Sequence, residues 1–497
     1  MSKIMKTNYK NTLQKIGLLS FCSMLLIISA CKKSFLDVDP QAQQPAVTFW
    51  KTESDATKAV NSIYANIRNW PNTAFPALAI ESIAGDDVEK GSSANDASYL
   101  NSFDNFTVSS TEGQLQGFWE GQYQNINLCN QVLDNIPTIS MDANLKSRYL
   151  AEAKFIRAYS YFRLVRAFGD VPLRLSVPKD ASEFNLARTP KAQVYAAIEK
   201  DLDDAAATLP QTYGSADLGR ATKGAAFALH AKVAMYLAKW NLVLSLTNNV
   251  KTLGYDLYPN FEQSFRTNNE NNIESVFEIQ CELLLNNAAA SNSQYSQVQG
   301  TRGTVGGWGF NVPTATLAAA FETGDTRRDA TIIFRGETTP QGDAIPPTGD
   351  NPMYNQKSYV PFSMIVSGYN EGSQQNVRVI RFADVLLMNA EAANELNDPT
   401  TAKASLNRVR TRARGGVVGV LTDITSTDKE TIKQAIWKER QVELAMESDR
   451  YFDVIRQGRG TAVFGAKGWK AGKNEVWPIP ATEIDKSAGK LTQNPNY

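Results

Sequence analysis

The chain has 497 residues, of which 42% are hydrophobic and 10% aromatic, an ordinary globular composition that argues against disorder. Its 51 basic and 51 acidic side chains cancel, so no electrostatic footprint for nucleic acid is present and no nucleic-acid partner is expected. The sequence holds one histidine, which is too few for most histidine-based metal sites and leaves little scope for a Ser-His or Cys-His nucleophile pair. We therefore expect no metal and no cofactor.

The N-terminal 30 residues have the pattern of a cleaved secretory signal. Four lysines and no acidic residue precede the apolar run "IGLLSFCSMLLIISA" at 16–30, which is too short for a comfortable membrane span. The run ends in "ISAC", which resembles a bacterial lipobox and implies cleavage before Cys31, a diacylglycerol on its sulfur and an acylated amino terminus. The alternative is an uncleaved anchor or a plain secretory peptide.

Cleavage changes the charge and the cysteine count. Removing four lysines and no acids from 51 and 51 leaves a net charge of −4. Cys22 leaves with the signal and Cys31 carries lipid. Cys129 and Cys281 could pair in an oxidising compartment, but two cysteines so far apart in sequence favour free buried thiols.

Amphipathic helices dominate the rest of the chain. In the segment 149–168, "YLAEAKFIRAYSYFRLVRAF", apolar residues recur every three to four positions, and Gly169 and Pro172 end the pattern. Similar patterns predict helices over 116–136, 191–209, 221–240, 380–396, 401–414 and 429–458. Their grouping in pairs predicts a mostly α fold, a superhelical scaffold of tetratricopeptide-like helical pairs with long irregular loops and few short strands.

Two long segments have a different composition. Residues 85–115 and 286–375 are rich in Gly, Ser, Asn, Gln and Thr, with "GTRGTVGGWGFNVP" at 300–313. Loops of this length in a compact domain are usually functional or disordered, so those that carry aromatic residues are candidates for a site.

Catalytic patterns are weak. Glu439, Glu443 and Glu447 share one helical face, and a glycosidase needs two carboxyl groups roughly 5 to 10 Å apart. Arg440 and Arg450 are interleaved with these acids, however, which favours an ion-pair network. The same holds for Glu391 and Glu395, and the single histidine, His230, is interpreted as a packed histidine. We therefore expect no catalytic residues and no enzyme, and a hydrolase is the less favoured alternative.

A family resemblance rests on several motifs in order. The sequence has "SFLDVDP" at 34–40, "FWEGQYQNINLCNQVLDNIP" at 118–137, "AEAKFIRAYSYFRLVRAFGDVPL" at 151–173, "WKERQVELAMESDRYFDVIRQG" at 437–458 and the ending "VWPIPATEIDKSAGKLTQNPNY" at 476–497. Together these resemble the SusD/RagB family of surface lipoproteins from Bacteroidetes. The predicted organisation is a signal peptide at 1–30 and a SusD-like domain at 31–497, with an N-terminal region at 31–220 and a C-terminal region at 270–497.

The resemblance implies a function. A member of this family would be anchored by the lipid on Cys31 to the outer membrane, exposed at the cell surface, as a lid over a SusC-like TonB-dependent transporter. It would capture an oligosaccharide or polysaccharide and deliver it to the transporter without chemistry. Peptide-handling, RagB-like relatives exist in the family, so peptide uptake is the second hypothesis.

The family carries no binding motif onto this sequence, so the site residues are predicted from sugar chemistry. A pyranose presents an apolar face and a rim of hydroxyls, which flat aromatic rings and nearby polar side chains can bind. Those residue types meet in two loop regions, 68–106 and 295–311. The predicted ligand-binding residues are Trp308, as the first choice, with Phe310, Tyr295, Arg302, Asn311, Trp70, Tyr99 and Asn101. Packing is the alternative for each, and Trp50, Trp119, Trp240 and Trp437 are interpreted as core.

Overall fold

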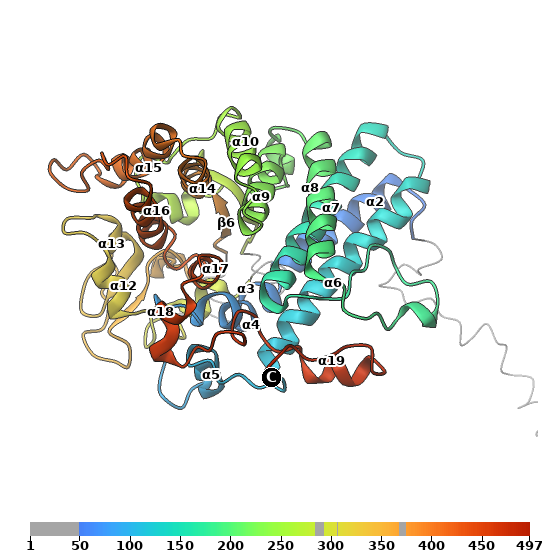
Figure 1. The fold of residues 1–497 in the computed structure, drawn as a ribbon, viewed down its shortest axis with the longest axis horizontal. Coiled ribbons are helices and arrows are strands. Elements are labelled where there is room, and N and C mark those ends of the chain that lie inside the picture. The colour runs from blue at the N-terminus through green and yellow to red at the C-terminus, as the bar shows by residue number, and fades with distance from the viewer. Residues whose placement is uncertain (1–48, 284–292, 306, 367–373) are drawn as a thin grey trace, which may run out of the picture.

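The computed structural model describes residues 49–283, 293–305, 307–366 and 374–497 (Figure 1). The predicted signal segment and Cys31 lie outside the described residues, and so does Gly306 of the glycine-rich loop. Within the described part of the chain, no helix combines the length and the apolarity that a membrane crossing requires.

The first half of the chain is a succession of paired helices. They are α2 (Glu53–Ile67), α6 (Gly113–Asn135), α7 (Ala143–Phe168), α8 (Lys191–Thr208), α9 (Lys223–Tyr236) and α10 (Trp240–Lys251). Each of α6 to α10 packs against the next, and α2 lies against α6 and α7, as Figure 1 shows. Asp142 caps the start of α7 by accepting a hydrogen bond from the Leu145 amide at 2.8 Å, and Gly169 ends it at a φ of 73°.

The second half continues the scaffold. Helix α14 (Phe382–Glu395) packs against α10, α15 (Pro399–Ala413) and α16 (Lys429–Glu443), and so joins the two halves. The shorter helices are α3 (Trp70–Thr73), α4 (Phe75–Leu78), α5 (Asn101–Asp104), α11 (Tyr295–Gln299), α12 (Ala315–Ala320), α13 (Arg327–Thr331), α17 (Arg450–Arg456), α18 (Gly460–Phe464) and α19 (Ala481–Lys486).

The strands form small antiparallel ladders. Among the described residues, β1 (Val88–Gly91) pairs with β3 (Phe310–Pro313), β2 (Ser275–Ile279) with β6 (Val377–Arg381), and β4 (Ile332–Phe334) with β5 (Met353–Asn355). The prediction of a mostly α fold with few short strands is confirmed.

Helices α6, α7 and α15 begin two to six residues before the predicted starts, and three other predicted segments differ in their extent. The segment 221–240 is two helices, because α9 ends at Tyr236 and Trp240 begins α10. The predicted helix at 380–396 starts two residues later, since its first two residues complete β6. The segment 429–458 breaks after α16, where Met446 and Ser448 both adopt a φ of 66° and the chain leaves the helix. Hydrophobic periodicity does not report such single-residue conformations.

The tryptophans and cysteines interpreted as structural are mostly enclosed. Trp119 is 3% exposed, and Trp50 and Trp240 are half-buried and pack against the core. Trp437 is also half-buried, and its indole N–H donates to Glu391 at 3.1 Å. Cys129 and Cys281 are both free, as predicted, and Cys129 is buried. His230 is 3% exposed, with Nδ1 3.2 Å from Asp203, which agrees with a packed histidine.

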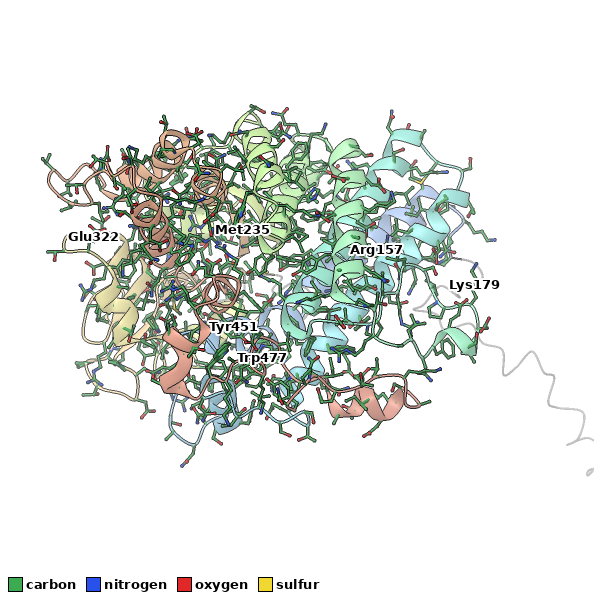
Figure 2. The ribbon with its side chains drawn as sticks, viewed as in Figure 1. Arg157, Lys179, Met235, Glu322, Tyr451 and Trp477 are labelled. Carbon is green, nitrogen blue, oxygen red and sulfur yellow. The ribbon has the colours of Figure 1, made fainter. Side chains whose placement is uncertain are left out.

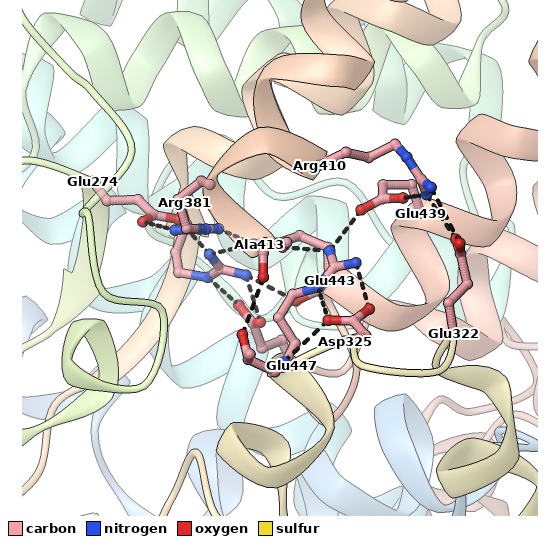
Figure 3. Close-up of polar contacts among 12 residues, drawn as sticks. Glu274, Glu322, Asp325, Arg381, Arg410, Ala413, Glu439, Glu443 and Glu447 are labelled. Atoms are coloured by element: carbon pink, nitrogen blue, oxygen red, sulfur yellow. Dashed lines mark hydrogen bonds and ion pairs between the residues drawn. The ribbon is translucent and has the colours of Figure 1, made fainter. Parts of the chain in front are cut away.

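A buried network of ion pairs surrounds the end of α16 (Figure 3). Glu443 is fully buried and contacts the guanidinium groups of Arg327, Arg381 and Arg412 at 2.9, 3.0 and 2.5 Å. Arg381 also pairs with Glu447 at 2.7 Å. Because each charge faces opposite charges and hydrogen-bond partners, the cost of burying them is offset only while the network is complete.

Removing one member of this network should therefore be costly. We predict that Arg381→Met lowers the free energy of unfolding by about 3–5 kcal/mol, because Glu443, Glu447 and Glu274 lose a buried cation. The matched control is Arg408→Met, whose partner Asp256 lies at 2.6 Å in an exposed pair, and which should cost less than about 1 kcal/mol. Urea titration measures both, and equal losses would contradict the assigned role of the network.

Candidate functional site

The two loop regions singled out in the sequence meet through the β1–β3 ladder. In this ladder Val88 lies opposite Pro313 and Gly91 opposite Phe310. The Ser92 amide extends the pairing by donating to the Gly309 carbonyl at 2.6 Å. Loops more than 200 residues apart in sequence are thereby placed side by side.

Aromatic rings from both regions gather at this junction. The ring centroids of Trp70 and Trp308 are 6.2 Å apart, and both rings contact Phe75, at 5.2 and 6.1 Å. Phe75 in turn meets Phe310 at 4.7 Å. Trp70 and Trp308 are half-buried, whereas Phe75 and Phe310 are 7% and 2% exposed, so the phenylalanines support two tryptophans that reach the surface.

Among the described residues, neither the Trp70 nor the Trp308 indole N–H donates a hydrogen bond. The backbone of Trp308 is fixed by its amide, which donates to the Gln297 carbonyl at 3.0 Å. The ring is therefore held in place while its polar edge is free to donate to a hydroxyl.

A charged pair borders the aromatic rings. Nη1 of Arg302 lies 2.8 Å from the Asp96 carboxylate and 3.1 Å from the Trp308 carbonyl oxygen. Ser92 donates to the same carboxylate at 2.8 Å. Both charged side chains keep about a third or more of their surface exposed, at 34% and 40%, so they fix the loops and still offer polar atoms to a ligand.

Two predicted residues are buried beneath the surface. Phe310 is 2% exposed and Asn311 is 0% exposed, so neither side chain presents surface to a ligand, which argues against the prediction that they contact one. Asn311 donates to Gln299 Oε1 at 2.7 Å, and Phe310 packs under Phe75. Both belong to β3, in which all four residues are buried; successive side chains point to opposite faces, so both faces of this strand are covered.

Tyr295 lines a cavity that is separate from the aromatic cluster. It lines an internal cavity of about 70 Å³ together with Glu81, Arg163 and Lys232, and burial raises the pKa of its hydroxyl to about 12. The structure does not bring this side chain into the aromatic cluster, so the prediction that Tyr295 contacts a surface ligand is not supported.

Tyr99 and Asn101 lie on the outer part of the first loop region. Tyr99 is 42% exposed and Asn101 is also exposed. Partial burial, together with the negative charges of Glu112 and Asp96, raises the pKa of the Tyr99 hydroxyl, which places this ring on the Asp96 side of the site. Both residues remain candidates for contact with a long ligand.

Some residues of the site were missed in the sequence. Lys90 donates to the carbonyls of Ser93 and Asp96 at 2.8 and 2.9 Å and so shapes the first loop. Asn351 donates to the Gly309 carbonyl at 2.9 Å. The only sequence signal for these residues is their position in loops rich in Gly and Asn: Lys90 bonds only to backbone carbonyls, which no side-chain pattern reveals, and the partner of Asn351 is distant in the chain.

The acids considered for hydrolysis are committed to ion pairs. Burial by itself raises the pKa of Glu443, but Arg412, Arg381 and Arg327 outweigh it and hold that pKa at about 2, whereas a general acid needs a raised value. Glu391 pairs with Arg456 at 2.7 Å and Glu395 with Lys429 at 3.3 Å. In the described part of the chain, no three His, Cys, Asp or Glu side chains are grouped to hold a metal ion.

The architecture defines a helical-repeat scaffold that presents an aromatic surface site on irregular loops. Comparison with known proteins gives the class: the profile described as "SusD family" matches residues 273–497, and the profile described as "Starch-binding associating with outer membrane" matches residues 34–237. The chain belongs to the SusD family, as its motifs predicted.

Individual relatives are similar to this chain over most of its length. SusD-like protein P2 of Formosa agariphila is 27% identical over 96% of this chain and 99% of its own. A solved structure titled "Laminarin binding SusD-like protein" is 28% identical, covers 90% of this chain and 100% of its own, and has a TM-score of 0.79. A SusD superfamily protein from Bacteroides vulgatus is 26% identical over 90% of this chain and all of its own, with a TM-score of 0.78.

The glycine at position 91 gives a direct test of the junction. Its φ is 71°, and a Cβ there would lie 2.4 Å from the Gly309 carbonyl oxygen. We predict that Gly91→Ala separates β1 from β3 and removes the hydrogen-exchange protection of the Ser92 amide. The control is Gly254→Ala, which has a φ of 87° and open space around the added methyl. Both variants share a backbone cost of about 1–2 kcal/mol, and only the clash differs. If the Ser92 amide stays protected in Gly91→Ala, the ladder does not hold the junction together.

Proposed function

We propose that this protein captures an oligosaccharide or polysaccharide at the outer membrane and passes it to a SusC-like TonB-dependent transporter without cleaving it. The observation that carries the proposal is the pair formed by Trp70 and Trp308, 6.2 Å apart and bordered by the Asp96–Arg302 pair. Aromatic faces stack on the C–H face of a sugar ring, and the polar border offers partners to its hydroxyls.

The comparisons support the same class of ligand. The relative at 28% identity is titled a laminarin-binding protein, and the profile over residues 34–237 is described as starch-binding. Laminarin and starch are neutral glucans. At the border of the site the cations Arg302 and Lys90 are balanced by the anions Asp96 and Asp350, so a neutral sugar fits it without leaving an unbalanced charge. Uptake of a peptide remains the second hypothesis, and no observation in the described residues favours it.

We expect the site to bind its ligand without catalysing a reaction on it. The Asp96 carboxylate at the border of the site is held by Ser92 and Arg302. Burial, the first influence on its pKa, is outweighed by these partners, which lower the pKa. A carboxylate kept ionised in this way accepts hydrogen bonds from hydroxyls but does not donate a proton to a leaving group.

Binding should depend on Trp308. We predict that Trp308→Ala weakens binding of the glycan that the wild-type protein retains, by roughly tenfold, through loss of one stacking surface. The matched control is Trp240→Ala, which removes a half-buried tryptophan from the start of α10 and should leave the affinity unchanged. Affinity electrophoresis in gels that contain laminarin, starch or xylan measures the effect.

The outcome also separates the two hypotheses. If none of these glycans retards the wild-type protein while a peptide binds it with affinity lost in Trp308→Ala, the site serves peptide uptake and the glycan proposal is wrong. Equal affinities of Trp308→Ala and Trp240→Ala would place the glycan elsewhere.

Surface anchoring rests on Cys31. We predict that Cys31→Ser yields a protein that still binds its glycan but disappears from the outer-membrane fraction, because several acyl chains are needed for stable anchoring. Cys281→Ser, which changes a half-buried free thiol, should fractionate as the wild type does. Retention of Cys31→Ser in the outer-membrane fraction would overturn the lipobox assignment.

A further inference from the structure

A second groove lies apart from the tryptophan site, between α6, the loop 172–186 and α19. It has a volume of about 400 Å³, within the range of small-ligand sites. Its apolar lining includes Trp119, Tyr123, Phe184 and Leu186. Figure 1 shows α19 near the start of α6, and Figure 2 labels Lys179 on the loop that borders the groove, at the outer edge of the molecule.

Phe184 is the most distinctive residue of this groove. Its side chain is 58% exposed, and it makes no ring contact with any other described residue. A large apolar side chain that the fold leaves uncovered contributes little to stability, because the gain from burying it is not realised. A role in contacting a ligand would account for its exposure.

The loop holds Phe184 in a fixed position. The Arg174 guanidinium donates to the Glu183 carbonyl at 2.7 Å and to the Phe184 carbonyl. The backbone of Arg174 is fixed in turn by the buried Tyr161, whose hydroxyl accepts from the Arg174 amide at 2.6 Å and donates to its carbonyl at 2.8 Å. Such bracing reduces the conformational entropy that a ligand would otherwise have to offset on binding.

The charged side chains that line the groove balance one another, and two of its amide side chains make no hydrogen bond with other described residues. Glu120 and Glu483 are balanced by Lys486, at 3.3 and 2.9 Å, and by Arg174. The amides of Asn127 and Asn185 make no hydrogen bond with other described residues, although they can both donate and accept. A charged ligand would gain no net attraction here, whereas a hydroxyl-rich neutral ligand could pair with both amides.

We propose that this groove is a second carbohydrate-binding site, in which Phe184 stacks on a sugar ring and Asn127 and Asn185 bind its hydroxyls. The ligand class rests on the proposed function, since a polysaccharide long enough to leave the tryptophan site can meet a second binding surface on the same protein. Two weak sites on one chain raise the overall affinity for a polymer through effective concentration, and less so for a short fragment.

Affinity electrophoresis of the full chain in laminarin, starch or xylan tests the proposal. The proteins compared are the wild type, Trp308→Ala, Phe184→Ala, Trp308→Ala with Phe184→Ala, and Trp308→Ala with Leu218→Ala. Leu218 is a matched control because it is 56% exposed but does not line this groove. We expect Trp308→Ala to keep a residual retardation, which Phe184→Ala weakens about tenfold and Leu218→Ala leaves unchanged.

Each other result has a defined meaning. If Trp308→Ala loses all retardation, or if the residual retardation survives Phe184→Ala, the second site is overturned and the first stands. If Phe184→Ala alone abolishes retardation while Trp308→Ala has no effect, the groove stands and the tryptophan site fails. If no glycan retards the wild type, both proposals fail. Loss of an outer-membrane protein partner in Phe184→Ala, with glycan retardation intact, would assign the groove to that partner and overturn the proposal.

Discussion

The buried ion pairs at the end of α16 are the interaction on which the second half of the structure depends. Glu439, Glu443 and Glu447 extend from one helix and its C-terminal turn toward arginines of three other segments (Figure 3). The break after α16 turns Glu447 toward Arg381 and toward Lys357, whose Nζ lies 2.6 Å from its carboxylate. These charges are stable in the interior only as a set, so they fix the segments that supply them relative to one another.

Buried amide side chains connect this ion-pair network to the candidate site. The Lys357 amide donates to Asn355 Oδ1 at 2.9 Å, and Asn355 donates to Gln299 Oε1 at 2.8 Å. Asn311 donates to the same oxygen at 2.7 Å, which ties the start of β3 to the chain beside α11. Trp308 lies three residues before Asn311, so the exposed ring is placed by a continuous series of buried polar contacts. This series explains how a glycine-rich loop can hold a tryptophan in a defined position.

The sequence predicted the scaffold better than the site. Helices with strong periodicity and clear end signals were located because local patterns decide them: the end of α7 at Phe168 was predicted, although the helix starts six residues before the predicted position 149. Trp70, Trp308 and Arg302 were selected by residue type, yet nothing local shows that they converge, since the β1–β3 ladder joins positions more than 200 residues apart. The burial of Phe310 and Asn311 was not foreseen for the same reason, because it involves contacts with Phe75 and Gln299.

The central claim is that two distant loops form one carbohydrate site, and a double-mutant cycle tests it most directly. The binding free energy of the retained glycan is measured calorimetrically for the wild type, Trp70→Ala, Trp308→Ala and the double variant. Because the two rings lie 6.2 Å apart and would face the same ligand, the account predicts a coupling energy of about 0.5 kcal/mol or more. Losses that add without coupling, or a Trp70→Ala variant that binds as the wild type does, would contradict a shared site.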